Sequence, residues 1–205
     1  MSNSWDALAA TWTVLAQLVR EPPSARALVT LHDDAAAGVW PLTGGRVAEG
    51  LALLAAEVSL QEVADDHFRL FRGPGERMAV PWASVYLTEE ALMFGEETLA
   101  VREAYARHGL AVPNLNQEPD DHIALELEFL ATLLVRAIEA DEAGDTAGAA
   151  ALVADHDGFV RDHLLPFAPD FFARVEQAAA TTFYRGVGIL GSDAVARFAE
   201  EPAHG

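Results

Sequence analysis

The chain has 205 residues, of which 51% are hydrophobic and 22% are charged, and this composition excludes a disordered chain. Its 13 basic residues are all arginines and stand against 32 acidic residues, which gives a net charge of −19. Such an acidic surface repels nucleic acid and anionic lipid, and it attracts a cationic partner such as an arginine-bearing peptide.

Cysteine is absent from the sequence, which excludes disulfides, thiolate metal sites and cysteine nucleophiles. The first residues show neither the basic start nor the small-residue cleavage site of a signal peptide. No stretch reaches the roughly 18 apolar residues of a membrane-spanning helix. We therefore expect a cytoplasmic protein with no cofactor and no nucleic-acid partner.

The elements predicted first along the chain are helices. Apolar residues at helical spacing favour an opening helix that Pro22 and Pro23 end. Ser59 and Glu62 have the spacing of a capping box, and an apolar stripe follows them. The helices predicted before the mid-chain loop cover about residues 5–20, 24–31, 47–58 and 59–72.

A long and unusually apolar loop is predicted at residues 72–87. The Gly-Pro-Gly run at 73–75 breaks the preceding helix, and the loop then carries Trp82 and Tyr86 among other apolar side chains. Loops of this length and character are often functional. A loop packed onto the core would explain some of the same side chains.

The second half of the chain is also predicted to be helical. Thr88 caps a helix that Gly95 interrupts and Gly109 ends, and residues 109–118 have the composition of a linker. Pro119 suits the first position of a long helix. The helices predicted after the linker cover about residues 119–143, 146–164, 169–180 and 182–199.

The predicted fold class is therefore all-α. No alternating segment of strand length stands out, and Pro81 weakens the one extended candidate. The linker divides the chain into an N-terminal helical lobe at 1–108, a hinge at 109–118 and a C-terminal helical lobe at 119–205.

The densest polar cluster surrounds the start of the predicted long helix. It contains Asp120, Asp121, His122 and Glu126. One interpretation is helix capping, with His122 and Glu126 paired four residues apart on a solvated face. A second is a metal-dependent hydrolase site formed by Asp121, His122 and Glu126, although a second histidine at ligand spacing is missing. A third is a recognition cluster whose carboxylates accept bidentate bonds from arginine.

Three stretches of the sequence together point to a known family. They are Leu70 to Gly75 with Pro81 to Leu87, Leu92 to Leu99 with Arg102 after it, and Asn116 to His122. The chain resembles the TorD/DmsD/NarJ family of redox-enzyme maturation chaperones, and it is most similar to the DmsD branch. The resemblance is strong over about residues 60–140.

The resemblance implies a TorD-like bundle of two packed helical lobes and a chaperone that is not an enzyme. Members of this family bind the twin-arginine signal peptide of a molybdopterin oxidoreductase and hold it for cofactor loading before export. The Tat translocase is therefore an implied partner. Exposed apolar surface and the linker would also favour a domain-swapped homodimer. A purine nucleotide is an alternative ligand, but no phosphate-cradling motif supports it.

The resemblance also implies which residues contact the signal peptide. A twin-arginine leader has a cationic head and an apolar middle, so its receptor needs an apolar groove and acidic groups at the rim. Gly75 and His67 stand where DmsD-like members tend to carry aromatic residues, which implies a changed leader preference. The implied binding residues are Leu70, Phe71, Trp82, Tyr86, Gly95, Asp121 and His122, with Glu118 and Pro119 shaping the hinge.

Overall fold

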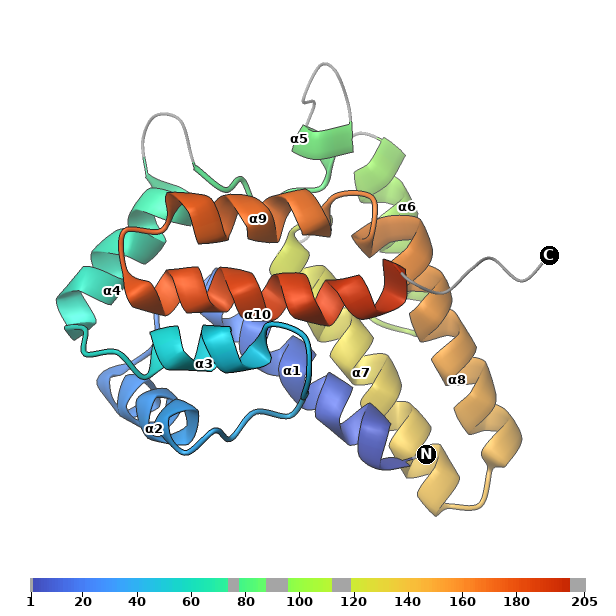
Figure 1. Ribbon diagram of the computed structural model, residues 1–205. Coiled ribbons are helices and arrows are strands. Elements are labelled where there is room, and N and C mark those ends of the chain that lie inside the picture. Colours follow the sequence, from blue (N-terminus) through green and yellow to red (C-terminus); the bar gives the residue numbers. More distant parts are fainter. Residues whose placement is uncertain (1, 74–77, 88–95, 112–118, 200–205) are drawn as a thin grey trace. The chain divides into compact units, whose positions relative to one another are not determined.

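The computed structural model describes residues 2–73, 78–87, 96–111 and 119–199, and these are mainly helical (Figure 1). The elements are α1 (Ser2–Arg20), α2 (Ala25–Ala36), α3 (Val47–Leu54), α4 (Leu60–His67), η1 (Phe68–Arg72), α5 (Ser84–Leu87), α6 (Glu96–Arg107), α7 (Ile123–Glu142), α8 (Thr146–Phe159), η2 (Val160–Leu164), α9 (Ala168–Ala178) and α10 (Thr182–Ala199). Within these ranges no residue lies in a named β-strand, and Trp82 and His122 form an isolated antiparallel bridge. The predicted all-α class is confirmed. None of the described helices is long and apolar enough to cross a membrane.

The chain forms two compact units, and each unit is assembled from two separate segments. Unit 1 contains Met1–Ala16 and Pro81–Phe167, and unit 2 contains Gln17–Val80 and Ala168–Gly205. These units cut across the predicted lobes, since each includes residues from before and after 109–118. Residues 112–118 lie outside the described part of the chain, so a hinge there stays a prediction.

Unit 2 is organised around α10, which lies between α3 and α9 (Figure 1). Glycines allow this close packing. A Cβ atom on Gly186 would lie 2.7 Å from the carbonyl oxygen of Gly50 on α3, and one on Gly188 would lie 2.5 Å from the backbone nitrogen of Glu176 on α9. Helix backbones can approach this closely only where side chains are missing.

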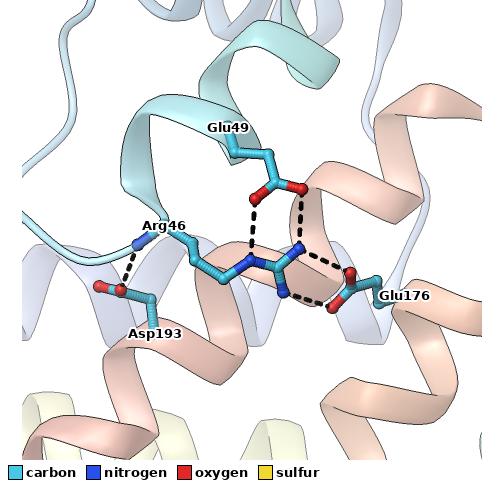
Figure 2. Close-up of polar contacts among 4 residues, drawn as sticks. All are labelled: Arg46, Glu49, Glu176 and Asp193. Atoms are coloured by element: carbon cyan, nitrogen blue, oxygen red, sulfur yellow. Dashed lines mark hydrogen bonds and ion pairs between the residues drawn. The ribbon is translucent and has the colours of Figure 1, made fainter.

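A polar network at the start of α3 connects this helix with α9 and α10 (Figure 2). The guanidinium of Arg46 donates two hydrogen bonds to the carboxylate of Glu49, at 2.7 and 2.8 Å, and two to that of Glu176, at 2.9 and 3.0 Å. Glu49 and Glu176 raise the pKa of Arg46 through these bonds. The backbone N–H of Arg46 donates to Asp193 at 2.8 Å. The network fixes where α3 begins, although exposed ion pairs contribute little stability.

The interior of unit 2 also contains polar groups, and these have partners. The carboxylate of Asp66 accepts hydrogen bonds from Arg69 at 2.6 Å, from the Ala180 N–H at 3.1 Å, and from the N–H and hydroxyl of Thr181 at 2.8 and 2.7 Å. His67 donates from Nε2 to the carbonyl of Val19 at 3.0 Å. Burial lowers the pKa of His67 to about 4, so its ring is neutral at physiological pH.

Unit 1 is built on α7, most of whose apolar side chains are buried. Phe129 of α7 forms a cluster with Tyr105 of α6 and Phe159 of α8, and its ring centroid lies 4.8 Å from each of the other two. The ring N–H of Trp12 on α1 donates to Nε2 of His156 on α8 at 3.2 Å.

Helix α7 begins at Ile123, four residues later than the predicted start at Pro119. His122 is its N-cap, and the Nδ1 atom of His122 accepts a hydrogen bond from the Ala124 N–H at 3.1 Å. The prediction was wrong here because Asp121 and Ile123 make backbone hydrogen bonds to the mid-chain segment, which holds this turn extended. The predicted end of α7 at Gly144 is confirmed, and Gly144 has a φ of +83°.

Candidate functional site

The candidate site is formed where residues 81–84 pair with residues 121–123. The N–H of Ile123 donates to the carbonyl of Pro81 at 2.8 Å, and the N–H of Ala83 donates to the carbonyl of Asp121 at 3.0 Å. Between these two bonds, the rings of Trp82 and His122 meet edge to face with centroids 5.6 Å apart. Two stretches that lie about 40 residues apart in the sequence are thereby joined within unit 1.

The side chain of Asp121 strengthens this junction. It is fully buried, and its carboxylate accepts hydrogen bonds from the Ser84 N–H at 2.8 Å and from the Thr98 hydroxyl at 2.9 Å. Ser84 begins α5 and Thr98 lies on α6, so one carboxylate connects three elements of unit 1. The geometry gives Asp121 a positioning role, because it holds the segment that carries Trp82.

Asp120 is also turned into the protein. Its carboxylate is buried and pairs with Arg102, whose Nε donates at 2.6 Å and whose Nη2 donates at 3.2 Å. This pairing raises the pKa of Arg102. The hydroxyl of Tyr105 donates to the carbonyl of Asp120 at 3.2 Å. Asp120 and Asp121, which precede α7, are therefore both held by hydrogen-bond donors from unit 1.

Glu126 differs from both aspartates because, among the residues that the structure describes, neither of its oxygens has a hydrogen-bond partner, although it is fully buried. Burial raises the pKa of Glu126 well above its ordinary value, and the nearby carboxylates of Asp121 and Glu97 raise it further. The predicted solvated pair of His122 and Glu126 is therefore wrong. His122 precedes the helix as its cap, and Glu126 faces the interior.

The hydrolase interpretation finds no support in this arrangement. In the part of the chain that the structure describes, no three histidine, aspartate or glutamate side chains are grouped so that they could hold a metal ion. The carboxylate of Asp121 accepts bonds from Ser84 and Thr98, and Nδ1 of His122 accepts the bond from the Ala124 N–H.

The structure brings several of the predicted site residues together. Trp82, Asp121 and His122 lie at the junction, and Pro119 is buried shortly before it. Tyr86 lies on α5, four residues after Trp82; the residue is partly exposed, and its ring centroid is 5.8 Å from that of Phe167. Trp82 is also partly exposed, so unit 1 presents two aromatic side chains from one short segment.

Of the other predicted residues, two belong to unit 2 and two fall outside the described part of the chain. Leu70 and Phe71 belong to unit 2 and are buried there, and the Phe71 ring stacks on that of Phe171 with centroids 5.9 Å apart. Gly95 and Glu118 fall outside the described residues. Sequence reasoning missed Thr98 and Arg102 as partners of the two aspartates, because no spacing rule connects α6 with the start of α7.

The fold and the site define an all-helical protein whose mid-chain aromatic segment is locked against the first turn of its longest helix. The family model described as the nitrate reductase delta subunit matches residues 42–173. The chain belongs to this family, and the resemblance seen in the sequence is confirmed.

Three relatives illustrate the similarity. The chain is 36% identical over 129 residues to the chaperone protein TorD of Vibrio cholerae serotype O1, which covers 63% of this chain and 57% of the relative. It is 30% identical over 130 residues to the probable Tat proofreading chaperone DmsD of Haemophilus influenzae, with 63% and 57% covered. It is 32% identical over 163 residues to the Tat proofreading chaperone DmsD of Salmonella typhi, with 78% and 71% covered. The match to the first two thus spans little more than half of their length, and both TorD and DmsD proteins are among the relatives.

Proposed function

We propose that this protein is a cytoplasmic chaperone, and not an enzyme, that binds the twin-arginine signal peptide of a molybdopterin oxidoreductase and holds it for cofactor loading before Tat export. The observation that carries the proposal is the junction of residues 81–84 with 121–123, which joins two of the family-like stretches into one site. The names of the relatives, chaperone protein TorD and Tat proofreading chaperone DmsD, support the same role.

The chemistry of the site suits an extended peptide. Trp82 and Tyr86 are partly exposed rings that offer large contact areas and lose little conformational freedom on binding. The net charge of −19 attracts the arginines of the leader over a longer range and speeds their encounter. Asp121 is buried and contributes by accepting the Ser84 N–H bond that holds the segment of Trp82 in place. Contributions from Leu70, Phe71, Gly95, Glu118 and Pro119 stay predictions.

Titration calorimetry with a synthetic twin-arginine leader tests the proposal. We expect Trp82→Ala to raise the dissociation constant at least about tenfold, in line with the loss of a central aromatic contact. Trp5→Ala is the matched control, because Trp5 is a partly exposed tryptophan on α1. A wild-type protein that binds no leader from its own host would reject the proposed function.

A second variant separates positioning from direct contact. In Asp121→Asn, the amide can no longer accept from both Ser84 and Thr98, so we expect the Trp82 segment to loosen. The leader should bind more weakly, and the near-ultraviolet dichroism of the free protein should change. A variant with weaker binding and an unchanged tryptophan signal would instead place Asp121 in contact with the leader.

Two partner proposals follow from the same role. We propose that the Tat translocase receives the released client, which copurification with translocase subunits tests. We also propose that a domain-swapped homodimer forms at high concentration, which light scattering over a concentration series tests.

A further inference from the structure

Unit 2 contains a surface groove that sequence reasoning did not find. Its volume is about 550 Å³, which is within the range of pockets that bind ligands. It lies between α2 and the connection from α3 to α4. The residues that line it are Leu28, Val29, His32, Leu54, Glu57, Val58, Ser59 and Glu62.

The floor of this groove is apolar. Leu28 and Leu54 are buried, Val58 is partly exposed, and the side chain of Val29 is 60% exposed. A single exposed valine needs no explanation, but here it continues an apolar surface that is already recessed. The groove can therefore take apolar side chains from another polypeptide.

The rim of the groove is acidic. Glu57 and Glu62 are exposed, and no arginine is among the lining residues that the structure describes. The carboxylate of Glu62 accepts hydrogen bonds from the hydroxyl of Ser59 at 2.6 Å and from its N–H at 3.0 Å. These bonds lower the pKa of Glu62, so it carries its charge at neutral pH.

The apolar floor and the acidic rim together determine which class of ligand is complementary to the groove. A second copy of this chain would bring another net charge of −19 toward the rim, and an anionic lipid surface is repelled in the same way. A segment that combines apolar side chains with adjacent arginines is complementary in both respects. We propose that this groove binds the apolar run of the twin-arginine leader next to its arginine pair. This inference rests on the proposed function and concerns a contact region of unit 2 by itself.

Leader binding to groove variants tests the inference. Val29→Asp places a charge where the apolar run would lie, and we expect the dissociation constant to rise at least about tenfold. Val135→Asp is the matched control, because Val135 on α7 is 46% exposed and belongs to unit 1. Val29 is exposed enough for its replacement to leave the fold intact, which circular dichroism checks.

The rim is tested separately. Glu57→Gln should weaken binding a few-fold and reduce the salt dependence of the affinity, whereas Glu139→Gln on the exposed face of α7 should change neither. A leader in which both arginines are replaced by glutamine should bind wild type and Glu57→Gln equally well. An effect of Glu57→Gln that persists with this leader would overturn the rim assignment.

The outcomes separate this inference from the proposed function. If Trp82→Ala weakens leader binding and Val29→Asp does not, the groove assignment is rejected and the proposed function stands. If wild type binds no leader, the proposed function itself fails. A photoreactive residue in the apolar run of the leader should crosslink to peptides that contain Leu28 or Val58, and crosslinks confined to unit 1 would also reject the groove.

Discussion

Asp66 of unit 2 and Glu126 of unit 1 are both buried carboxylates, and they differ in whether donors reach them. In unit 2, Asp66 accepts hydrogen bonds from Arg69, from the Ala180 N–H and from two groups of Thr181. In unit 1, neither oxygen of Glu126 has a hydrogen-bond partner within the described part of the chain. A buried charge with donors fixes the geometry around it, whereas one without donors is driven toward its neutral form. The residues around Asp66 and Glu126 in the sequence did not indicate which of the two carboxylates would have donors.

The largest expected effect comes from removing the satisfied carboxylate. Asp66→Ala leaves the Thr181 N–H and hydroxyl without their acceptor and leaves Arg69 without its ion pair. We expect the free energy of unfolding to fall by about 3 to 4 kcal/mol in urea titrations. Asp65→Ala, on the exposed side of the same helix, should change it by less than about 0.5 kcal/mol. Equal effects of the two variants would contradict the comparison.

The two units also differ in how closely their helices approach at glycine positions. Gly188→Ala tests the close packing of α9 and α10 in unit 2. A Cβ atom there would lie 2.5 Å from the backbone nitrogen of Glu176 and 2.8 Å from its Cα, so α9 and α10 would have to separate. We expect a loss of about 2 kcal/mol in the free energy of unfolding, which is typical of overpacking. A variant as stable as wild type would show that this helix pair can move apart without cost.

Much of the fold could be predicted because it depends on local chemistry. The capping box of Ser59 and Glu62 is present with both of its hydrogen bonds. Gly109 and Gly144 end their helices with positive φ values of +67° and +83°. Helix α10 covers the predicted range of 182–199. Each of these features is decided by residues within one turn of each other.

The start of α7 and the details of the site could not be predicted, because distant residues decide them. The turn before Ile123 is held by backbone bonds to Pro81 and Ala83, and the carboxylate of Asp121 is held by Ser84 and Thr98. The resemblance to the family did anticipate that the regions around Trp82 and Asp121 lie together. They did not indicate that the carboxylates would face inward as internal anchors, which is a result of tertiary packing.

A smaller effect on the free energy of unfolding is expected from Glu126→Gln, and this effect changes with pH. The ordinary pKa of this group is 4.5, and burial raises its folded-state pKa well above that value. Above pH 4.5 the unfolded chain therefore loses this proton while the folded protein keeps it. Wild-type stability then falls by about 1.4 kcal/mol per pH unit until the raised pKa is passed.

Glutamine has no such proton, so the stability of Glu126→Gln relative to wild type should rise by about 1.4 kcal/mol between pH 5 and pH 6. Chemical denaturation at a series of pH values measures this difference. Glu128→Gln, two residues further along the same helix, is the control, because Glu128 is partly exposed. Parallel pH profiles for wild type and Glu126→Gln would show that the buried carboxylate finds a donor in solution.

The smallest expected effect is that of a glycine substitution in unit 1, which should raise the free energy of unfolding where Gly188→Ala lowers it. Gly158 lies in the last turn of α8 in unit 1, and among the described residues a Cβ atom there would have only the Arg161 guanidinium within 4 Å, at 3.6 Å. Alanine has the higher helix propensity and restricts the unfolded chain, so Gly158→Ala should stabilise the protein by about 0.5 kcal/mol and raise the melting temperature by about 1 to 2 °C. Differential scanning calorimetry measures this shift. A loss of stability would mean that α8 needs a glycine for a close contact, as α10 does at Gly188.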